Sequence, residues 1–407
     1  MERNIEELPL LSIVIPTRNR QRYAISAIKS ILSIQSNELE LVVQDNSDSD
    51  DLSNYLGEHP SDPRLHYTYT SSHLSIIDNF NQALKKTRGE YVCCIGDDDV
   101  VNFEIVSVCR WAKSNAIDAI TDNWRVTFNW PDFIPNNANA KAGILSIRKF
   151  SGKAKLLDPE VELKKCMLSG GVGLQRLPKV YLGIVRRACL SETLQRIMRH
   201  QAGTCADMYL SVAIASSIKR LCVLDYPVVI PGFSAAGAGM LISTRRHQGR
   251  IEDSPHLRAC PNYEWPDIIP RFYSVETFYA ESAWAALQAT GRVDLIRKFN
   301  LAFLYLLCAT LYPEYRAAVQ TSLRLAKQAA NQNFVHFVAR HVWRLFEEFA
   351  ALVAKRIEAR SLYLWQSALE KQIGGIDDTQ QAARALREYL IQTCRQFDAD
   401  QIHIVNK

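Results

Sequence analysis

The first hundred residues alternate short apolar runs with amphipathic segments, and this alternation limits the possible folds more than any other feature of the chain. Four runs have the length and composition of buried strands: 10–15, 39–44, 65–69 and 91–95. Between them, 25–32 and 76–84 repeat apolar residues at helical spacing. Strands that alternate with helices predict a parallel sheet covered by helices, which places the chain in the α/β class.

A polar cluster follows three of the four predicted strands, at 16–20, 45–51 and 96–99. In parallel sheets the carboxyl ends of the strands meet at one edge, and ligands bind beyond that edge. We therefore expect the three clusters to lie together and to form the ligand-binding site.

The third cluster contains three consecutive carboxylates, Asp97, Asp98 and Asp99. Adjacent carboxylates repel one another, and a bound divalent cation removes that cost. Mn²⁺ and Mg²⁺ prefer oxygen ligands, and Mg²⁺ commonly takes one or two carboxylates together with substrate phosphates. The triplet therefore predicts a Mn²⁺ or Mg²⁺ site for a phosphate-bearing ligand. The alternative is a solvated acidic turn, or the N-cap of the following segment.

The first two clusters offer groups that suit a nucleotide. Asp45 and Asn46 end the second predicted strand, where a carboxylate can accept hydrogen bonds from a base or a ribose. An Asx turn is the alternative for this pair. Arg18 and Arg20 suit phosphate oxygens, and the alternative for each is an ordinary solvated loop.

The remaining two thirds of the chain divide by pattern. The 407 residues suffice for two domains. The pattern is mixed up to about 265 and turns helical from about 270, most clearly over 342–357. We predict a catalytic domain at 1–265 and a helical C-terminal region at 266–407. This region could pack on the catalytic domain, associate into a homo-oligomer or touch a membrane surface.

Cysteine usage and charge limit the compartment and the partners. The ten cysteines include no C-x-x-C pair, so buried free thiols in a reducing compartment are expected. The first residues lack a basic region and a long apolar stretch, so no signal peptide is expected. We predict a cytoplasmic protein, either free or peripheral to the inner face of the membrane. A net charge of +5 without a basic-aromatic stripe disfavours nucleic acid as a partner.

Three strings carry a resemblance to a known family: SIVIPTRNR at 12–20, LELVVQDNSDSDD at 39–51 and ALKKTRGEYVCCIGDDDV at 83–100. Together they resemble the N-terminal half of inverting family-two glycosyltransferases, over roughly residues 9–235. The resemblance implies the GT-A fold, a Rossmann-like nucleotide-diphospho-sugar transferase domain. It also implies donor-binding residues. The end of the first strand contacts the nucleotide in that family, which here means Pro16, Thr17, Arg18, Asn19 and Arg20.

Further donor and metal contacts follow from the same resemblance. The Asp that ends the second strand reads the base, which implies Asp45 with its neighbour Asn46. Asp78 lies in a segment that borders the donor pocket in relatives, and its alternative is a helix-surface carboxylate.

The acidic segment corresponds to the family's DXD metal motif, with one departure. Gly96 stands where the family often has the first Asp of Asp-x-Asp-Asp. Either Asp97 or Asp98 therefore faces the ribose, and either Asp98 or Asp99 binds the metal.

Inverting transfer also requires a base, because a carboxylate must deprotonate the acceptor hydroxyl during direct displacement. Family members carry an Asp at the start of a helix beyond the metal motif. Asp207 matches it, with Ala206 in place of the Pro in the Pro-Asp-x-Tyr pattern of polysaccharide-building subgroups. The alternative for Asp207 is helix capping or the helix dipole. A late His often joins the metal, which makes His247 a candidate ligand, with a solvated loop as its alternative.

The function implied is metal-dependent, inverting transfer of a sugar from a UDP- or GDP-sugar to a glycan or lipid-linked acceptor in surface polysaccharide or glycoconjugate biosynthesis. One alternative is a nucleotidyltransferase, although such enzymes usually have a glycine-rich phosphate loop that SIVIPTRNR lacks. The other is a catalytically inactive scaffold that binds nucleotide sugars. Asp207 separates the two classes, because a binding module needs no base.

Overall fold

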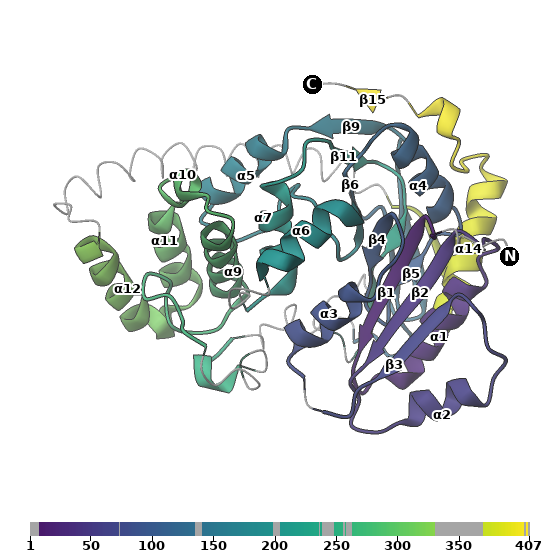
Figure 1. Cartoon of the computed structure of the whole chain (residues 1–407), viewed down its shortest axis with the longest axis horizontal. Coiled ribbons are helices and arrows are strands. Elements are labelled where there is room, and N and C mark those ends of the chain that lie inside the picture. Colours follow the sequence, from purple (N-terminus) through teal and green to yellow (C-terminus); the bar gives the residue numbers. More distant parts are fainter. Residues whose placement is uncertain are drawn as a thin grey trace, which may run out of the picture.

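A nine-stranded mixed sheet forms the centre of the computed structural model (Figure 1). The structure describes residues 8–72, 74–134, 141–197, 204–235, 237, 248–254, 257, 263–329, 369–402 and 404–405. In spatial order the strands are β15 (Ile404–Val405), β9 (Ala154–Leu157), β11 (Leu221–Leu224), β6 (Ala119–Asp122), β10 (Gly183–Arg186), β4 (Tyr91–Cys94), β1 (Leu11–Thr17), β2 (Leu39–Asp45) and β3 (Leu65–Tyr69).

The strand directions bring the polar loops to one edge of the sheet. β1 is parallel to β2 and β4, and β2 is parallel to β3. β10 is antiparallel to both of its neighbours, β4 and β6, so β4 and β6 point the same way. The loops after β1, β2, β4 and β6 therefore leave from the same edge, as expected for the predicted α/β class.

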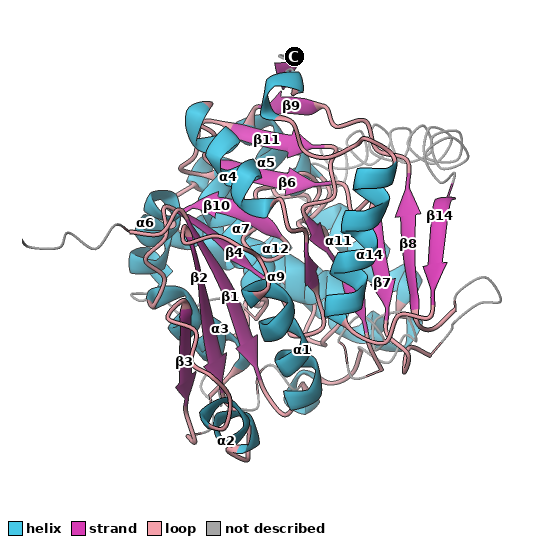
Figure 2. Cartoon of the chain, turned by 90° about the vertical axis from the view of Figure 1, so that its right-hand side faces the viewer, coloured by secondary structure: helices cyan, strands magenta, loops and turns pink. Residues whose placement is uncertain are grey.

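Each face of the sheet has its own hydrophobic core, because successive side chains of a strand point to opposite faces. Leu11, Ile13 and Ile15 of β1 belong to one core, whereas Val14 belongs to the other. The helices that contribute to the first core include α1 (Gln21–Leu32), α4 (Ile105–Ser114) and α14 (Thr379–Gln392). Those of the second core include α3 (Ile76–Lys85), α5 (Pro159–Leu168), α7 (Ala206–Ala215) and α9 (Val275–Ala289). Figure 2 shows α1 and α14 in front of the strands.

The remaining elements complete the two faces. They are α2 (Asp51–Gly57), α6 (Arg187–Ile197), α10 (Val293–Ile296), α11 (Leu301–Leu311), α12 (Arg316–Ala329), η1 (Ile251–Asp253), η2 (Pro313–Tyr315), η3 (Ala399–Gln401), β5 (Val100–Val101), β7 (Val126–Asn129), β8 (Ile144–Arg148), β12 (Val229–Ile230), β13 (Gly232–Phe233) and β14 (Leu369–Gly374). β5 pairs with β12, and a four-stranded sheet has the order β13-β7-β8-β14.

Helices α9 to α12 form a lobe at one end of the molecule, on the left of Figure 1. The chain then returns to the sheets: β14 pairs with β8, β15 pairs with β9, and α14 packs on α1. Residues 369–405 of the predicted helical region thus contribute one strand to the four-stranded sheet and one to the nine-stranded sheet. The boundary at 265 stays a prediction, and the helical pattern at 342–357 lies outside the described residues.

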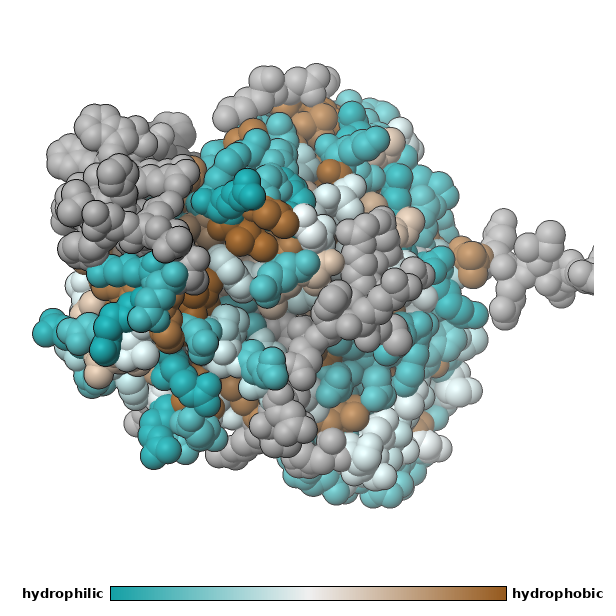
Figure 3. Space-filling view, turned by 60° about the vertical axis from the view of Figure 1, so that its left-hand side comes forward, coloured by the Kyte–Doolittle hydropathy of each residue, from teal (hydrophilic) through white to brown (hydrophobic). Residues whose placement is uncertain are grey.

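The surface of the molecule is mixed in character. On the face shown in Figure 3, apolar side chains lie in several small areas between hydrophilic ones. Leu306 and Leu311 of α11 are among the exposed large apolar residues. Within the part of the chain that the structure describes, every helix is too short or too polar to cross a membrane.

Candidate active site

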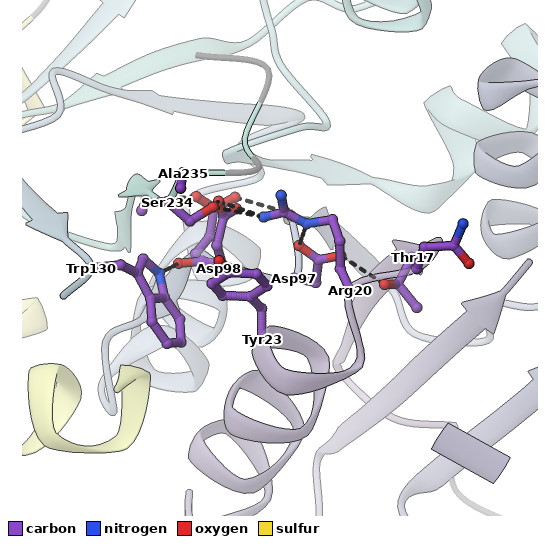
Figure 4. A network of polar contacts seen from close by, with 12 residues as sticks. Thr17, Arg20, Tyr23, Asp97, Asp98, Trp130, Ser234 and Ala235 are labelled. Carbon is purple, nitrogen blue, oxygen red and sulfur yellow. Dashed lines mark hydrogen bonds and ion pairs between the residues drawn. The ribbon is translucent and has the colours of Figure 1, made fainter. Parts of the chain in front are cut away.

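The loops after β1 and β4 meet through direct contacts between side chains. The Thr17 hydroxyl donates to Asp97 Oδ2 at 2.7 Å. Arg20 is the residue before α1, and its guanidinium contacts two carboxylates (Figure 4). Its Nε lies 2.6 Å from Asp97 Oδ1, and its Nη2 lies 2.7 Å from Asp98 Oδ2. The sequence therefore predicted correctly that the clusters at 16–20 and 96–99 come together.

A distant segment, β13 and the residues after it, completes the acidic cluster. The Ser234 hydroxyl donates to Asp98 Oδ2 at 2.5 Å, and the Gly232 amide donates to Asp99 Oδ1 at 2.8 Å. Asp99 Oδ2 also accepts from the Gly96 amide at 2.7 Å and from the Tyr181 hydroxyl at 3.2 Å. Gly232 is required here by close approach, because a Cβ at this position would lie 1.8 Å from the carbonyl oxygen of Asp98.

The three carboxylates are buried around a single guanidinium. Asp97, Asp98 and Asp99 are 4%, 7% and 3% exposed. Burial raises the pKa of Asp97 to about 6, with the charge of Asp98 adding to the rise and Arg20 opposing it. Burial and the charge of Asp98 raise the pKa of Asp99 to about 7. The cluster therefore holds more negative charge than Arg20 neutralises, which favours binding of a further cation.

The donor set suits a hard divalent cation. All the acidic ligands offer oxygen atoms, which Mg²⁺ and Mn²⁺ prefer. Among the described residues, no three or more His, Cys, Asp or Glu side chains are grouped so that they could hold a metal ion by themselves. The candidate ligand His247 lies outside the described residues.

Arg20 also has an unfilled donor. Its Nη1 is buried and has no hydrogen-bond partner among the described residues. Burial works against the charge of Arg20, yet Asp97 and Asp98 outweigh it and the pKa of the guanidinium is raised, so the group stays charged. A buried cationic N–H without a partner suits an anionic ligand oxygen, such as one of a phosphate.

The loop after β2 is held by its own side chains and by β3. Asp45 is fully buried, and its carboxylate accepts from the Ser47 amide at 2.9 Å and from the Tyr67 hydroxyl at 2.9 Å. The first of these bonds is the Asx turn that the sequence left open as an alternative. Asn46 donates to the carbonyl oxygens of Thr70 and Ser72 at 2.7 and 2.6 Å. Contact of Asp45 or Asn46 with a base stays a prediction.

The remaining predicted donor residues lie in β1, in the loop after it and in α3. Arg18 pairs with Asp48 at 3.0 Å. Asn19, at a left-handed φ of 56°, accepts from the Asp48 amide at 2.8 Å, so it ties the loop after β1 to the loop after β2. Pro16 lies within β1. Asp78 is exposed in the first turn of α3 and accepts from its N-cap residue Ser75 at 2.7 Å. Their contacts with a donor stay predictions.

Asp207 lies in the first turn of α7. The N-cap residue of α7 is Cys205, so Asp207 is not itself the cap. Burial raises the pKa of Asp207 to about 6, although the positive charge of Lys179 lowers it. The charge of Asp207 also acts on Tyr181, the residue whose hydroxyl contacts Asp99. Tyr181 thus lies close to both the acidic cluster and the candidate base.

A buried carboxylate of α9 positions the start of α7, and the sequence did not suggest it. Glu281 Oε2 accepts from the Thr204 amide at 2.7 Å and from the Thr204 hydroxyl at 2.8 Å. The neighbouring Ser282 hydroxyl accepts from the Cys205 amide at 2.8 Å. Glu281 has no exposed surface and lies in the apolar middle of α9, where an acidic residue among alanines is a sequence signal of a structural role.

Comparison with known proteins identifies the family. Residues 12–163 match the model described as glycosyl transferase family 2. The chain is 30% identical over 327 residues to the GalNAc(5)-diNAcBac-PP-undecaprenol beta-1,3-glucosyltransferase of Campylobacter jejuni, an alignment that covers 78% of this chain and 99% of the relative. It is 28% identical over 163 residues to chondroitin synthase of Escherichia coli, covering 37% of this chain and 24% of the relative.

A crystal structure of S. aureus TarS in complex with UDP-GlcNAc aligns over 93% of this chain and 92% of that chain, with 15% identity and a TM-score of 0.46. The Campylobacter jejuni relative shows the family, because the alignment covers nearly the full length of that relative. The chain belongs to glycosyl transferase family 2 and is a glycosyltransferase, as the motifs of its first hundred residues predicted.

Proposed function

We propose that this glycosyltransferase moves a sugar, with inversion at the anomeric carbon, from a nucleoside diphosphate sugar to a hydroxyl of a glycan or lipid-linked acceptor. The observation that carries the proposal is the arrangement around Tyr181. Its hydroxyl contacts Asp99 of the buried acidic cluster, which also holds the unfilled donor of Arg20, and the charge of Asp207 acts on the same tyrosine. A donor site and a separate proton acceptor are the two parts that sugar transfer to a hydroxyl needs.

On the donor side, the groups that would bind the diphosphate are Asp98, Asp99 and Arg20. Asp98 and Asp99 would hold a Mn²⁺ or Mg²⁺ ion, which when bound offsets the negative charge that develops on the leaving diphosphate. Arg20 Nη1 is available to a phosphate oxygen, while its other nitrogens keep the guanidinium fixed against Asp97 and Asp98. Asp97, held by Thr17 and Arg20, is placed to accept a hydrogen bond from the ribose.

On the acceptor side, the proposed base is Asp207. The acceptor oxygen attacks the anomeric carbon from the side opposite to the diphosphate, which inverts the configuration. As the new C–O bond forms, the hydroxyl proton passes to the Asp207 carboxylate. A pKa of about 6 keeps Asp207 ionised at neutral pH while leaving it a better proton acceptor than an exposed aspartate.

The named relatives support a role in building a surface polysaccharide or glycoconjugate. The Campylobacter jejuni relative is named for glucosyl transfer to GalNAc(5)-diNAcBac-PP-undecaprenol, and the Escherichia coli relative is a chondroitin synthase. We therefore favour a lipid-linked glycan as the acceptor here. Such an acceptor would hold the protein at the cytoplasmic face of a membrane, in agreement with the predicted compartment.

A thermal-shift screen tests the donor class. UDP-, GDP-, CMP- and dTDP-sugars are each added with Mn²⁺ and with EDTA. One nucleotide should stabilise the protein in Mn²⁺, by about 2.7 kcal/mol at a hundred-fold excess over Kd, and much less in EDTA. A matched variant, Asp99→Asn, should lose most of this stabilisation. No stabilisation of the wild type by any nucleotide sugar would contradict the proposal.

A further inference from the structure

Trp124 is an exposed aromatic residue at the carboxyl edge of the sheet. It follows β6 by two residues and is 40% exposed, whereas Trp111, Trp130 and Trp265 are each no more than 8% exposed. An indole combines a large apolar face with one N–H donor, so an exposed one offers a contact surface to a ligand or a partner. Its position at the carboxyl edge makes Trp124 a candidate for such a contact.

The backbone near this edge is strained at two positions, one after β6 and one before β10. Trp124 has a φ of 48°, in the left-handed region that a bulky side chain rarely adopts. Leu182, next to the residue of β10 that pairs with β6, has a φ of 56°. Strain of this kind persists where the surrounding structure holds a residue in place, and it is concentrated at functional sites. The fold thus holds the indole at a defined position.

The segment 179–183 connects Trp124 with both parts of the proposed site. Lys179 Nζ lies 4.9 Å from the centre of the Trp124 ring. The same ammonium acts electrostatically on Asp207, and Tyr181, two residues further on, donates to Asp99. The turn is tight, because a Cβ at Gly183 would lie 2.3 Å from the carbonyl oxygen of Lys179.

The order of the strands separates two sides of the acidic cluster. β4 carries the cluster, and β1, with Thr17 and Arg20 at its end, lies on one side of it. β10 and β6, with Lys179 and Trp124, lie on the other side. The nucleotide is assigned to the β1 side by the contacts of Arg20. The β6 side is then left for the acceptor. Lys179 lies on this side, and its charge acts on Asp207.

We propose that Trp124 and Lys179 form the subsite for the acceptor sugar, an inference that rests on the proposed function. The C–H groups on one face of a pyranose ring pack against the indole, as apolar groups pack on aromatic faces. The Lys179 ammonium donates to a ring hydroxyl and helps to place the attacking hydroxyl at Asp207. Trp124 is therefore a residue that determines acceptor affinity rather than donor affinity.

Saturation-transfer NMR with octyl glycosides tests the subsite. The probes are the octyl β-glycosides of glucose, galactose, N-acetylglucosamine and N-acetylgalactosamine, added with UDP and Mn²⁺. In the wild type, at least one probe should receive saturation at its pyranose protons. Trp124→Ala should weaken this binding by roughly ten-fold, the size of effect expected for a lost aromatic contact. Trp124→Tyr keeps a ring and should retain most of the affinity.

Two controls make the outcome specific. Trp284→Ala removes a partly exposed tryptophan in the helical lobe, where its ring contacts Phe299, and it should bind the probes as the wild type does. Stabilisation by the nucleotide sugar is measured on every variant. If the nucleotide sugar stabilises the wild type but no probe binds, or if Trp124→Ala binds as tightly as the wild type, the subsite is wrong. Absence of stabilisation by any nucleotide sugar would instead overturn the proposed function.

Discussion

Replacing Gly232 with alanine should push β13 away from the acidic turn. The added Cβ would lie 1.8 Å from the carbonyl oxygen of Asp98 and 2.6 Å from its carbonyl carbon. Both contacts are with backbone, so no side-chain rotation relieves them. The φ of Gly232 is not left-handed, so the effect of the substitution is steric rather than conformational.

The structure gives the size of the disturbance. Ordinary contact begins at 3.4 Å, so the two segments must separate by about 1.6 Å. The hydrogen bond from the Gly232 amide to Asp99 Oδ1, now 2.8 Å long, cannot survive that movement. Overpacking of this kind lowers the free energy of unfolding by about 1–3 kcal/mol. Misplacement of catalytic groups by about 1 Å lowers the rate about 10²-fold, so we expect a loss of that order in transfer.

Urea unfolding and the initial rate of transfer measure the two effects. The matched control is Gly57→Ala, at the end of α2, where an added Cβ meets no atom within 4 Å. It should unfold at the same or a slightly higher urea concentration than the wild type and transfer sugar at the same rate. A Gly232→Ala protein with wild-type stability and wild-type transfer would refute the close approach of β13 to the cluster.

Three further predictions concern charge. The proposed base is the ionised form of Asp207, and its pKa is about 6, so the transfer rate should rise with pH through about 6 and then level off. Lys179→Met should move this midpoint upwards, and an unmoved midpoint would contradict the electrostatic effect of Lys179 on Asp207. Glu281→Ala leaves the amide and hydroxyl donors of Thr204 buried without an acceptor, so the free energy of unfolding measured in urea should fall by about 1–3 kcal/mol. An unchanged urea midpoint would contradict the importance of these contacts. Calorimetry should find weaker binding of the nucleotide diphosphate in EDTA than in Mn²⁺, and equal affinities would exclude the metal site.

The sequence predicted the parts of the fold that are built from local pattern. The apolar runs at 10–15, 39–44, 65–69 and 91–95 correspond to β1, β2, β3 and β4. β1, β2 and β4 are buried on both faces, so their sequences are largely apolar runs that stand out from their surroundings, whereas β3 is a partly buried edge strand. The polar loops that follow them were predicted to converge because parallel strands end at one edge, and the contact of Thr17 with Asp97 agrees with this.

The partners of the acidic cluster could not be found in this way. Gly232 belongs to a strand of two residues, too short to give a pattern, and Ser234 directly follows that strand. β14 was missed because its sequence, LEKQIG, is mostly polar and exposed, as an edge strand allows. Each of these contacts spans more than a hundred residues along the chain.

Asp207 has the central role in the proposed mechanism, and one variant tests that role. Asp207→Asn keeps the size of the side chain and removes its capacity to accept a proton. Affinity for the nucleotide sugar and Mn²⁺, measured by calorimetry, should stay near the wild-type value, because the donor groups lie on the β1 side of the cluster. Transfer should fall by roughly 10²–10⁴-fold, the usual contribution of a positioned base. A folded Asp207→Asn protein that transfers sugar at a near-normal rate would mean that Asp207 serves only the start of α7 and that the base is another residue.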